Sequence, residues 1–98
     1  MRKYELIYVV APDIDEEGQA ALQSKLTDII DKDKGQVDEI KEWGKQRLAY
    51  EIDDHREGFY IEIHFSGDGD VVAELDRVIK ITDGILRHII VRREEKQQ

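Results

Sequence analysis

Residues 43–52, WGKQRLAYEI, have the alternating pattern of a β-strand that carries an irregularity. Leu48, Tyr50 and Ile52 are separated by polar or small residues, so one face of this strand is apolar. Gly44 lies just upstream, and a glycine inside a strand commonly marks a β-bulge or a close approach of two backbones. We therefore expect a long, irregular strand with its bend near Gly44.

The sequence on either side of this strand predicts five further elements. The strand that contains residues 43–52 extends over 37–53, and further strand patterns are found at residues 3–10, 59–65 and 85–93. A turn is expected at 54–58. Two amphipathic helices separate the strands. Asp13 or Asp15 is expected to cap the first helix. Asp68 or Asp70 is expected to cap the second.

The order strand, helix, strand, strand, helix, strand predicts an α+β fold of the ferredoxin-like, split βαβ type. In this fold a four-stranded antiparallel sheet carries both helices on one face, and the other face is open. We assign residues 1–93 to this single domain and residues 94–98 to a short polar tail. An open sheet face is also how common modules for single-stranded RNA present their aromatic side chains.

Length and composition narrow the class of protein. A chain of 98 residues can bury one modest core. It contains no cysteine, which excludes disulfides and thiolate chemistry. No apolar run is long enough for a signal peptide or a membrane span, so we expect a cytoplasmic protein without a membrane partner.

The net charge of −8 is concentrated in two stretches. Residues 13–33 contain seven acidic and two basic residues, and residues 68–83 contain five acidic and two basic residues. Both stretches coincide with the predicted helices, and the rest of the chain sums to zero. If both helices cover one face of the sheet, the other face and the sheet edges are available to an anionic partner such as RNA.

The sequence contains no recognisable catalytic motif. It has neither a glycine-rich phosphate loop of the required spacing nor a nucleophile beside a base. Glu62 and His64 lie two apart on a strand and supply two candidate metal ligands, but no neighbouring residue supplies a third or fourth. We therefore expect no enzyme activity, no cofactor, no metal and no small-molecule substrate.

Basic residues that could contact RNA lie on three stretches far apart in the sequence. They are Arg2 and Lys3, then Lys45 and Arg47, then Arg87, His88, Arg92 and Arg93. Antiparallel pairing of the first and last strands would bring Arg2 close to Arg92 and Arg93. We expect a compact cationic edge from this pairing, with binding that weakens steeply as salt is added.

The signature segment of the bacterial small-subunit ribosomal protein six family resembles residues 44–52. Gly44, Arg47, Leu48, Ala49, Tyr50 and Ile52 match it, while Gln46 stands where the family usually has a basic residue. The opening residues 1–5, MRKYE, the pair Pro12-Asp13 and the segment 83–88, DGILRH, also resemble the family in order and spacing. The resemblance covers nearly the whole chain.

The resemblance implies a structural component of the small ribosomal subunit. Family members bind the central domain of small-subunit ribosomal RNA together with small-subunit ribosomal protein eighteen. A basic partner of this kind would supply phosphate contacts that an acidic chain lacks. The candidates for contact with that protein are Ile7, Val9, Trp43, Tyr50 and Tyr60. The alternative is a ferredoxin-like regulatory module that binds a small ligand, which predicts a pocket and binding without RNA.

Overall fold

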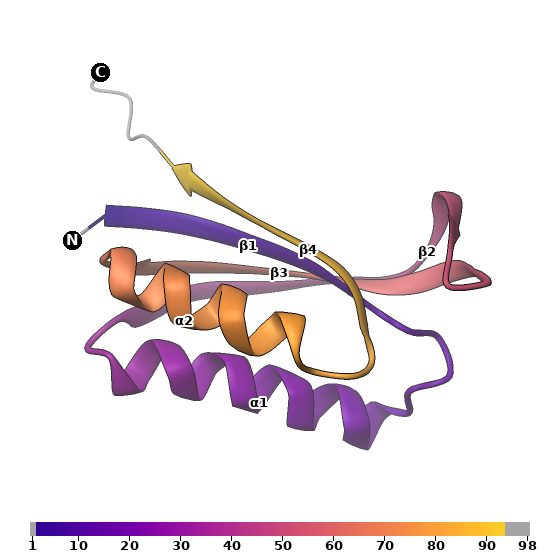
Figure 1. The fold of residues 1–98 in the computed structure, drawn as a ribbon, viewed down its shortest axis with the longest axis horizontal. Coiled ribbons are helices and arrows are strands. Elements are labelled where there is room, and N and C mark those ends of the chain that lie inside the picture. Colours follow the sequence, from indigo (N-terminus) through magenta and orange to yellow (C-terminus); the bar gives the residue numbers. More distant parts are fainter. Residues whose placement is uncertain (1, 94–98) are drawn as a thin grey trace.

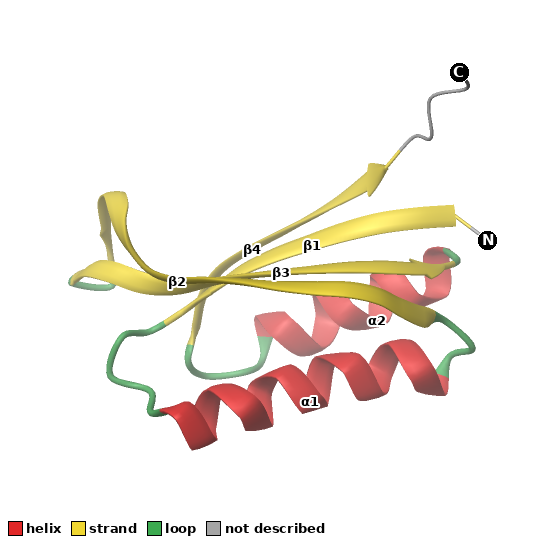
Figure 2. Ribbon diagram, turned by 180° about the vertical axis from the view of Figure 1, so that it is seen from behind, coloured by secondary structure: helices red, strands yellow, loops and turns green. Residues whose placement is uncertain are grey.

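Four antiparallel strands and two helices make up the computed structural model, which describes residues 2–93. The elements are β1 (Arg2–Val10), α1 (Glu16–Lys32), β2 (Gln36–Ile52), β3 (His55–Gly67), α2 (Gly69–Lys80) and β4 (Ile85–Arg93). The strand order is β2-β3-β1-β4, and both helices lie on one side of the sheet (Figures 1 and 2). The predicted ferredoxin-like fold is therefore confirmed. The expected polar tail at 94–98 lies outside the described residues.

The hydrophobic core lies between the sheet and the two helices. Alternate residues of β1, among them Leu6 and Tyr8, point into this core together with Ile63 and Phe65 of β3. Because side chains alternate across a strand, the intervening residues of β1 and β3 face the open side of the sheet. Burial of one face of each central strand thus fixes which side chains form the exposed surface.

Each helix is capped by one of the two aspartates that were predicted for it, Asp15 for α1 and Asp68 for α2. The carboxylate of Asp15 accepts a hydrogen bond from the Gly18 amide at 2.8 Å, and that of Asp68 accepts one from the Asp70 amide at 3.0 Å. Each cap satisfies an amide that has no partner within the helix. The acidic stretches are therefore helical, and the negative charge lies on the helix side of the sheet as expected. Neither helix combines the length and apolarity needed to span a membrane within residues 2–93.

The expected irregularity of β2 is present. Its pairing with β3 shifts register between Glu42 and Gly44, and Gly44 adopts a left-handed backbone conformation with φ of 78°. A bulge bends a strand and increases its twist. Beyond it, the β2–β3 hairpin extends past the helices and its tip turns away from them (Figure 1). The sequence prediction of a bend near Gly44 is confirmed.

The turn between β2 and β3 is shorter than predicted. Asp53 and Asp54 alone form it, with φ of 49° and 66°, and Ile52 pairs directly with His55. Two consecutive left-handed residues are the geometry of the tightest hairpin turn, and aspartate tolerates that conformation better than most residues. The predicted turn at 54–58 was wrong because His55 to Gly58 are already part of β3.

Candidate nucleic-acid interface

The open face of the sheet presents aromatic and aliphatic side chains. Trp43 is 55% exposed and Tyr50 is 60% exposed, and Ile89 and Val91 of β4 are also exposed. Trp43 lies at the bulge of β2, where Gly44 lets the backbone bend. This face therefore combines flat ring surfaces with apolar surface, and no helix covers it (Figure 2).

A shallow groove crosses this face between β2 and β1. Its lining residues are Ile7, Trp43, Gln46, Arg47, Tyr60 and Glu62. The indole Nε1 of Trp43 donates a hydrogen bond to Glu62 Oε1 at 3.2 Å, which fixes the ring beside the groove. Four of the predicted interface residues, namely Ile7, Trp43, Arg47 and Tyr60, thus meet in one place.

Tyr50 and Arg87 are joined across the open face. Arg87 Nη1 lies 2.5 Å from the Tyr50 hydroxyl, and the guanidinium carbon lies 5.7 Å from the centroid of the ring. Tyr50 belongs to the tip of the β2–β3 hairpin, whereas Arg87 belongs to β4 at the opposite edge of the sheet. The curled hairpin therefore brings a cation and an aromatic ring together in the manner suited to nucleic-acid contact.

The predicted pairing of β1 with β4 is present, but it divides the basic residues between two faces. Lys3 pairs with Arg93 and Tyr4 pairs with Arg92. Residues paired directly across two strands share a face, so Arg93 joins the open face while Arg92 lies on the helix side with Tyr4.

Arg2 shares the helix-side face of the sheet with Arg92, because the pairing of Tyr4 with Arg92 makes these two arginines diagonal neighbours across β1 and β4. Arg2 also borders a groove with Asp33 and Asp68, at the loops that enter β2 and α2. The basic residues of β1 and β4 thus divide into an open-face set, Lys3, Arg87 and Arg93, and a helix-side set, Arg2, His88 and Arg92. On β2, Lys45 pairs with Phe59 and Arg47 pairs with Glu57, so both belong to the helix-side face, although Arg47 also borders the groove beside Trp43.

Lys45 and His88 have partners on the helix side. The bulge places Lys45 opposite Phe59, and the Lys45 amino group lies 5.6 Å from the centroid of that ring. His88 Nε2 lies 2.8 Å from Asp76 Oδ1 on α2. Hydrogen bonds from Lys80 and then from His88 hold the pKa of the Asp76 carboxyl below its usual value. The contact of His88 with an acidic helix makes it a poor ligand for phosphate.

Val9 is also poorly placed for its predicted role. It lies on the open-face side of β1 but is only 3% exposed, so it offers almost no surface to a partner protein. The backbone at Gly58 of β3 passes close to this side chain, since a Cβ added there would overlap with Val9 Cγ1, and sequence spacing alone does not indicate such an approach. Ile89 and Val91 of β4 are apolar positions on this face that the sequence reasoning missed.

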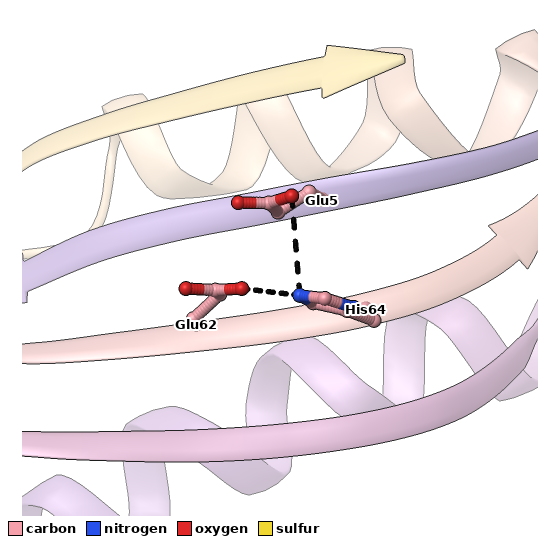
Figure 3. Close-up of side chains that lie close together, drawn as sticks. All are labelled: Glu5, Glu62 and His64. Atoms are coloured by element: carbon pink, nitrogen blue, oxygen red, sulfur yellow. Dashed lines mark hydrogen bonds and ion pairs between the residues drawn. The ribbon is translucent and has the colours of Figure 1, made fainter. Parts of the chain in front are cut away.

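A cluster of titratable side chains lies near the centre of the open face (Figure 3). Glu5 of β1 pairs with His64 of β3, and Glu62 lies two residues before His64 on the same face. Glu62 and His64 are 7% and 6% exposed, and their side chains are in direct contact. Hydrogen bonding from His64 lowers the pKa of Glu62, although burial opposes that shift. Glu62 and His64 were predicted from the sequence as two candidate ligands, and the pairing of β1 with β3 adds Glu5.

Comparison with known proteins gives one family match over most of the chain. The family model described as Ribosomal protein S6 matches residues 3–92. The crystal structure of the 30S ribosomal protein S6 from Thermotoga maritima is similar, with a TM-score of 0.89 and 34% sequence identity. That alignment covers 94% of this chain and 87% of the Thermotoga chain.

A second solved structure shares the fold without close sequence similarity. The C-terminal domain of the MgtC protein from Mycobacterium tuberculosis aligns with a TM-score of 0.67 at 9% identity. The alignment covers 99% of this chain and 93% of that domain. At this identity the likeness concerns the backbone arrangement alone, because one fold serves many functions.

Proposed function

Because the chain belongs to the ribosomal protein S6 family, we propose that it binds the central domain of small-subunit ribosomal RNA together with small-subunit ribosomal protein eighteen. Family membership makes the chain a structural component of the small subunit of the cytoplasmic ribosome, not an enzyme.

The arginines at the β4 edge of the open face carry this proposal. Both acidic stretches are helices on one side, while Arg87 and Arg93 of β4 lie on the other. An acidic protein approaches RNA productively only through a surface where positive charge dominates locally. We therefore assign RNA contact to the β4 edge of the open face, where Lys3 lies beside Arg93.

The exposed apolar side chains support contact with a protein partner on the same side. Trp43 and Tyr50 are exposed rings of the kind that anchor protein interfaces, and Tyr60 and Ile7 border the groove beside Trp43. A basic partner seated there would add phosphate contacts that this chain lacks, and joint binding would raise the affinity of both proteins. Aromatic anchors next to arginines thus favour a shared protein and RNA surface.

A filter-binding titration with central-domain ribosomal RNA tests the proposal. The chain is titrated with and without protein eighteen at several salt concentrations. We expect weak binding alone and much tighter binding with the partner, with an affinity that falls as salt is raised. Absence of RNA binding in both arms would refute the proposal and favour the ligand-binding module instead.

Arg87→Ala tests the open face, and Arg77→Ala is its matched control. Arg77 is an exposed arginine on α2 that is paired with Glu74 at 2.8 Å, so it carries the same charge on the opposite layer. Loss of one phosphate contact should lower the salt-dependence slope by about one unit. We expect this change for Arg87→Ala only. If both variants bind the RNA with equal affinity, the RNA does not contact the open face at Arg87.

A further inference from the structure

We propose that Glu5, Glu62 and His64 form a binding site for a divalent transition-metal ion, with Zn²⁺ as the best match. One ligand atom from each residue lies within 4.8 Å of the others, so a single ion can contact all three. The three side chains converge from β1 and β3 (Figure 3).

The fold holds these ligands in fixed positions. Glu5 and His64 are directly paired across β1 and β3, which are the two central strands of the sheet. Glu62 and His64 lie on one face of β3 and are almost fully buried. Ligands carried by strands are held more firmly than ligands carried by loops, so little ordering is needed when an ion binds.

The donor set selects the class of ion. Imidazole nitrogen with carboxylate oxygen suits zinc and its neighbours, whereas calcium and magnesium prefer sites made only of oxygen. Two ionised carboxylates and a neutral histidine carry a charge of −2, which a divalent ion balances. Three protein ligands also leave one tetrahedral position open for water or for a group from a partner.

The residues around the cluster resemble the outer shell of a metal site. The indole of Trp43 donates to Glu62 Oε1 at 3.2 Å, which leaves Oε2 facing the cluster. Glu39 Oε1 lies 4.0 Å from His64 Nδ1, on the side of the ring away from the cluster. Ligating carboxylates are usually held by such hydrogen bonds, and ligating histidines usually donate their second N–H to a carboxylate.

Binding of an ion requires one proton to move. Arg93 Nη1 lies 2.8 Å from His64 Nδ1, so Nδ1 accepts a hydrogen bond and Nε2 carries the proton that is shared with Glu62. An ion at Nε2 displaces this proton to Nδ1, where Glu39 is available to accept its hydrogen bond. Arg93 then leaves the ring. Metal binding and the Arg93–His64 contact are therefore mutually exclusive.

Calorimetric titration of Zn²⁺ into the full chain, freed of metal with a chelator, tests this site. Glu5→Gln removes one ligand at a side chain that is 24% exposed, so the substitution leaves the core intact. His64→Gln removes the nitrogen ligand. His88→Gln is the matched control, because His88 also contacts a carboxylate, that of Asp76 at 2.8 Å, yet within residues 2–93 no second carboxylate joins them in a three-ligand cluster.

We expect saturable binding of one ion, weakened roughly tenfold or more by Glu5→Gln and by His64→Gln and unchanged by His88→Gln. Arg93→Gln should tighten binding, since it removes the competing donor and a positive charge. Co²⁺ in place of Zn²⁺ should give the visible spectrum of a tetrahedral nitrogen and oxygen site. Absence of binding by the unaltered chain, or equal binding by Glu5→Gln, would overturn the proposal. If His64→Gln fails to fold, the His64 Nε2 resonance of the unaltered chain is followed by NMR as Zn²⁺ is added. A shift of this resonance supports the site, and an unchanged resonance overturns the proposal.

Discussion

The Tyr50 hydroxyl lies 2.5 Å from Arg87 Nη1, which connects the tip of the β2–β3 hairpin to the strand at the opposite edge of the sheet. Both side chains lie on the surface, and Tyr50 is 60% exposed. Contacts between exposed groups contribute little to folding, because water competes for them. The value of this contact therefore lies in orienting the ring and the guanidinium toward a partner.

Tyr50→Phe separates the two components of this contact. The ring and its cation–π contact with Arg87 remain, while the hydrogen bond is lost. We expect a loss of less than about 1 kcal/mol in the free energy of unfolding, measured by urea denaturation. Arg87→Ala removes both components and should cost the free protein no more than about 1 kcal/mol beyond that. A loss of several kcal/mol in either variant would make the contact a determinant of the fold.

Tyr8 presents the opposite case, a hydroxyl buried without a partner. Its side chain is 1% exposed, and its hydroxyl is the buried side-chain polar atom that lacks a hydrogen bond within residues 2–93. An unpaired buried hydroxyl costs stability that a phenylalanine ring does not. Tyr8→Phe should therefore be neutral or raise the free energy of unfolding by up to about 1 kcal/mol. Tyr4→Phe is the control. An equal gain in stability for Tyr4→Phe would mean that the gain comes from replacing tyrosine by phenylalanine in general and not from the unpaired Tyr8 hydroxyl.

The same tyrosine predicts a dependence on alkaline pH. Burial raises the pKa of Tyr8 far above its usual value, and the charge of Glu42 adds to the shift. The unfolded chain then loses this proton first, so Tyr8 leaves the free energy of unfolding unchanged below about pH 10 and lowers it as pH rises above that value. Tyr8→Phe removes that decline. Denaturation curves at pH 8 and pH 11 should therefore show a larger advantage for the variant at the higher pH.

The sequence predicted the elements of the fold well because burial leaves a periodic pattern. Leu6 and Tyr8 alternate with residues of the open face in β1, and Ile63 and Phe65 do so in β3. The two-residue turn at 53–54 escaped this reasoning, since it depends on two aspartates adopting left-handed conformations. Glycine at 58 was the stronger turn signal in the sequence, although it belongs to β3.

The nucleic-acid interface was predicted less well than the fold, because it depends on which face of the sheet each side chain lies on. The bulge at Gly44 reverses the alternation of β2 and turns Lys45 toward Phe59. On β4, Arg92 and Arg93 are adjacent in sequence and yet lie on opposite faces. The partnership of Glu5 with His64 follows from the register of β1 and β3, which sequence spacing alone does not define.

Gly44→Ala tests the backbone requirement at the bulge. Gly44 has φ of 78°, and a methyl group added there would meet no atom within 4 Å, so any cost comes from the conformation and not from a clash. We expect a loss of about 1 kcal/mol in the free energy of unfolding. Gly69→Ala is the matched control, because it also has open space but no left-handed conformation. Equal losses in the two variants would mean that the bulge imposes no strain.

Asp76→Asn tests the connection between α2 and β4 through its dependence on acid. Asp76 Oδ2 contacts Lys80 at 2.8 Å on its own helix, and Oδ1 contacts His88 of β4 at 2.8 Å. These hydrogen bonds lower the pKa of the Asp76 carboxyl in the folded protein. The unfolded chain therefore takes up this proton first as pH falls. The stability that the carboxylate confers is present above the carboxyl pKa of the unfolded chain, about 4, and is lost as pH falls through the lower folded value.

We accordingly expect Asp76→Asn to be less stable than the unaltered chain at pH 6, with the difference shrinking toward pH 3. Glu74→Gln is the matched control on the same helix. Hydrogen bonds from Arg77 lower the pKa of Glu74, but that pair lies within α2 and joins it to no other element. Urea denaturation of both variants across this pH range should show the larger acid-sensitive loss for Asp76→Asn, since only that carboxylate also binds the edge strand. Equal losses would mean that the His88 contact adds nothing, and β4 would then depend on its pairing with β1 and on packing alone.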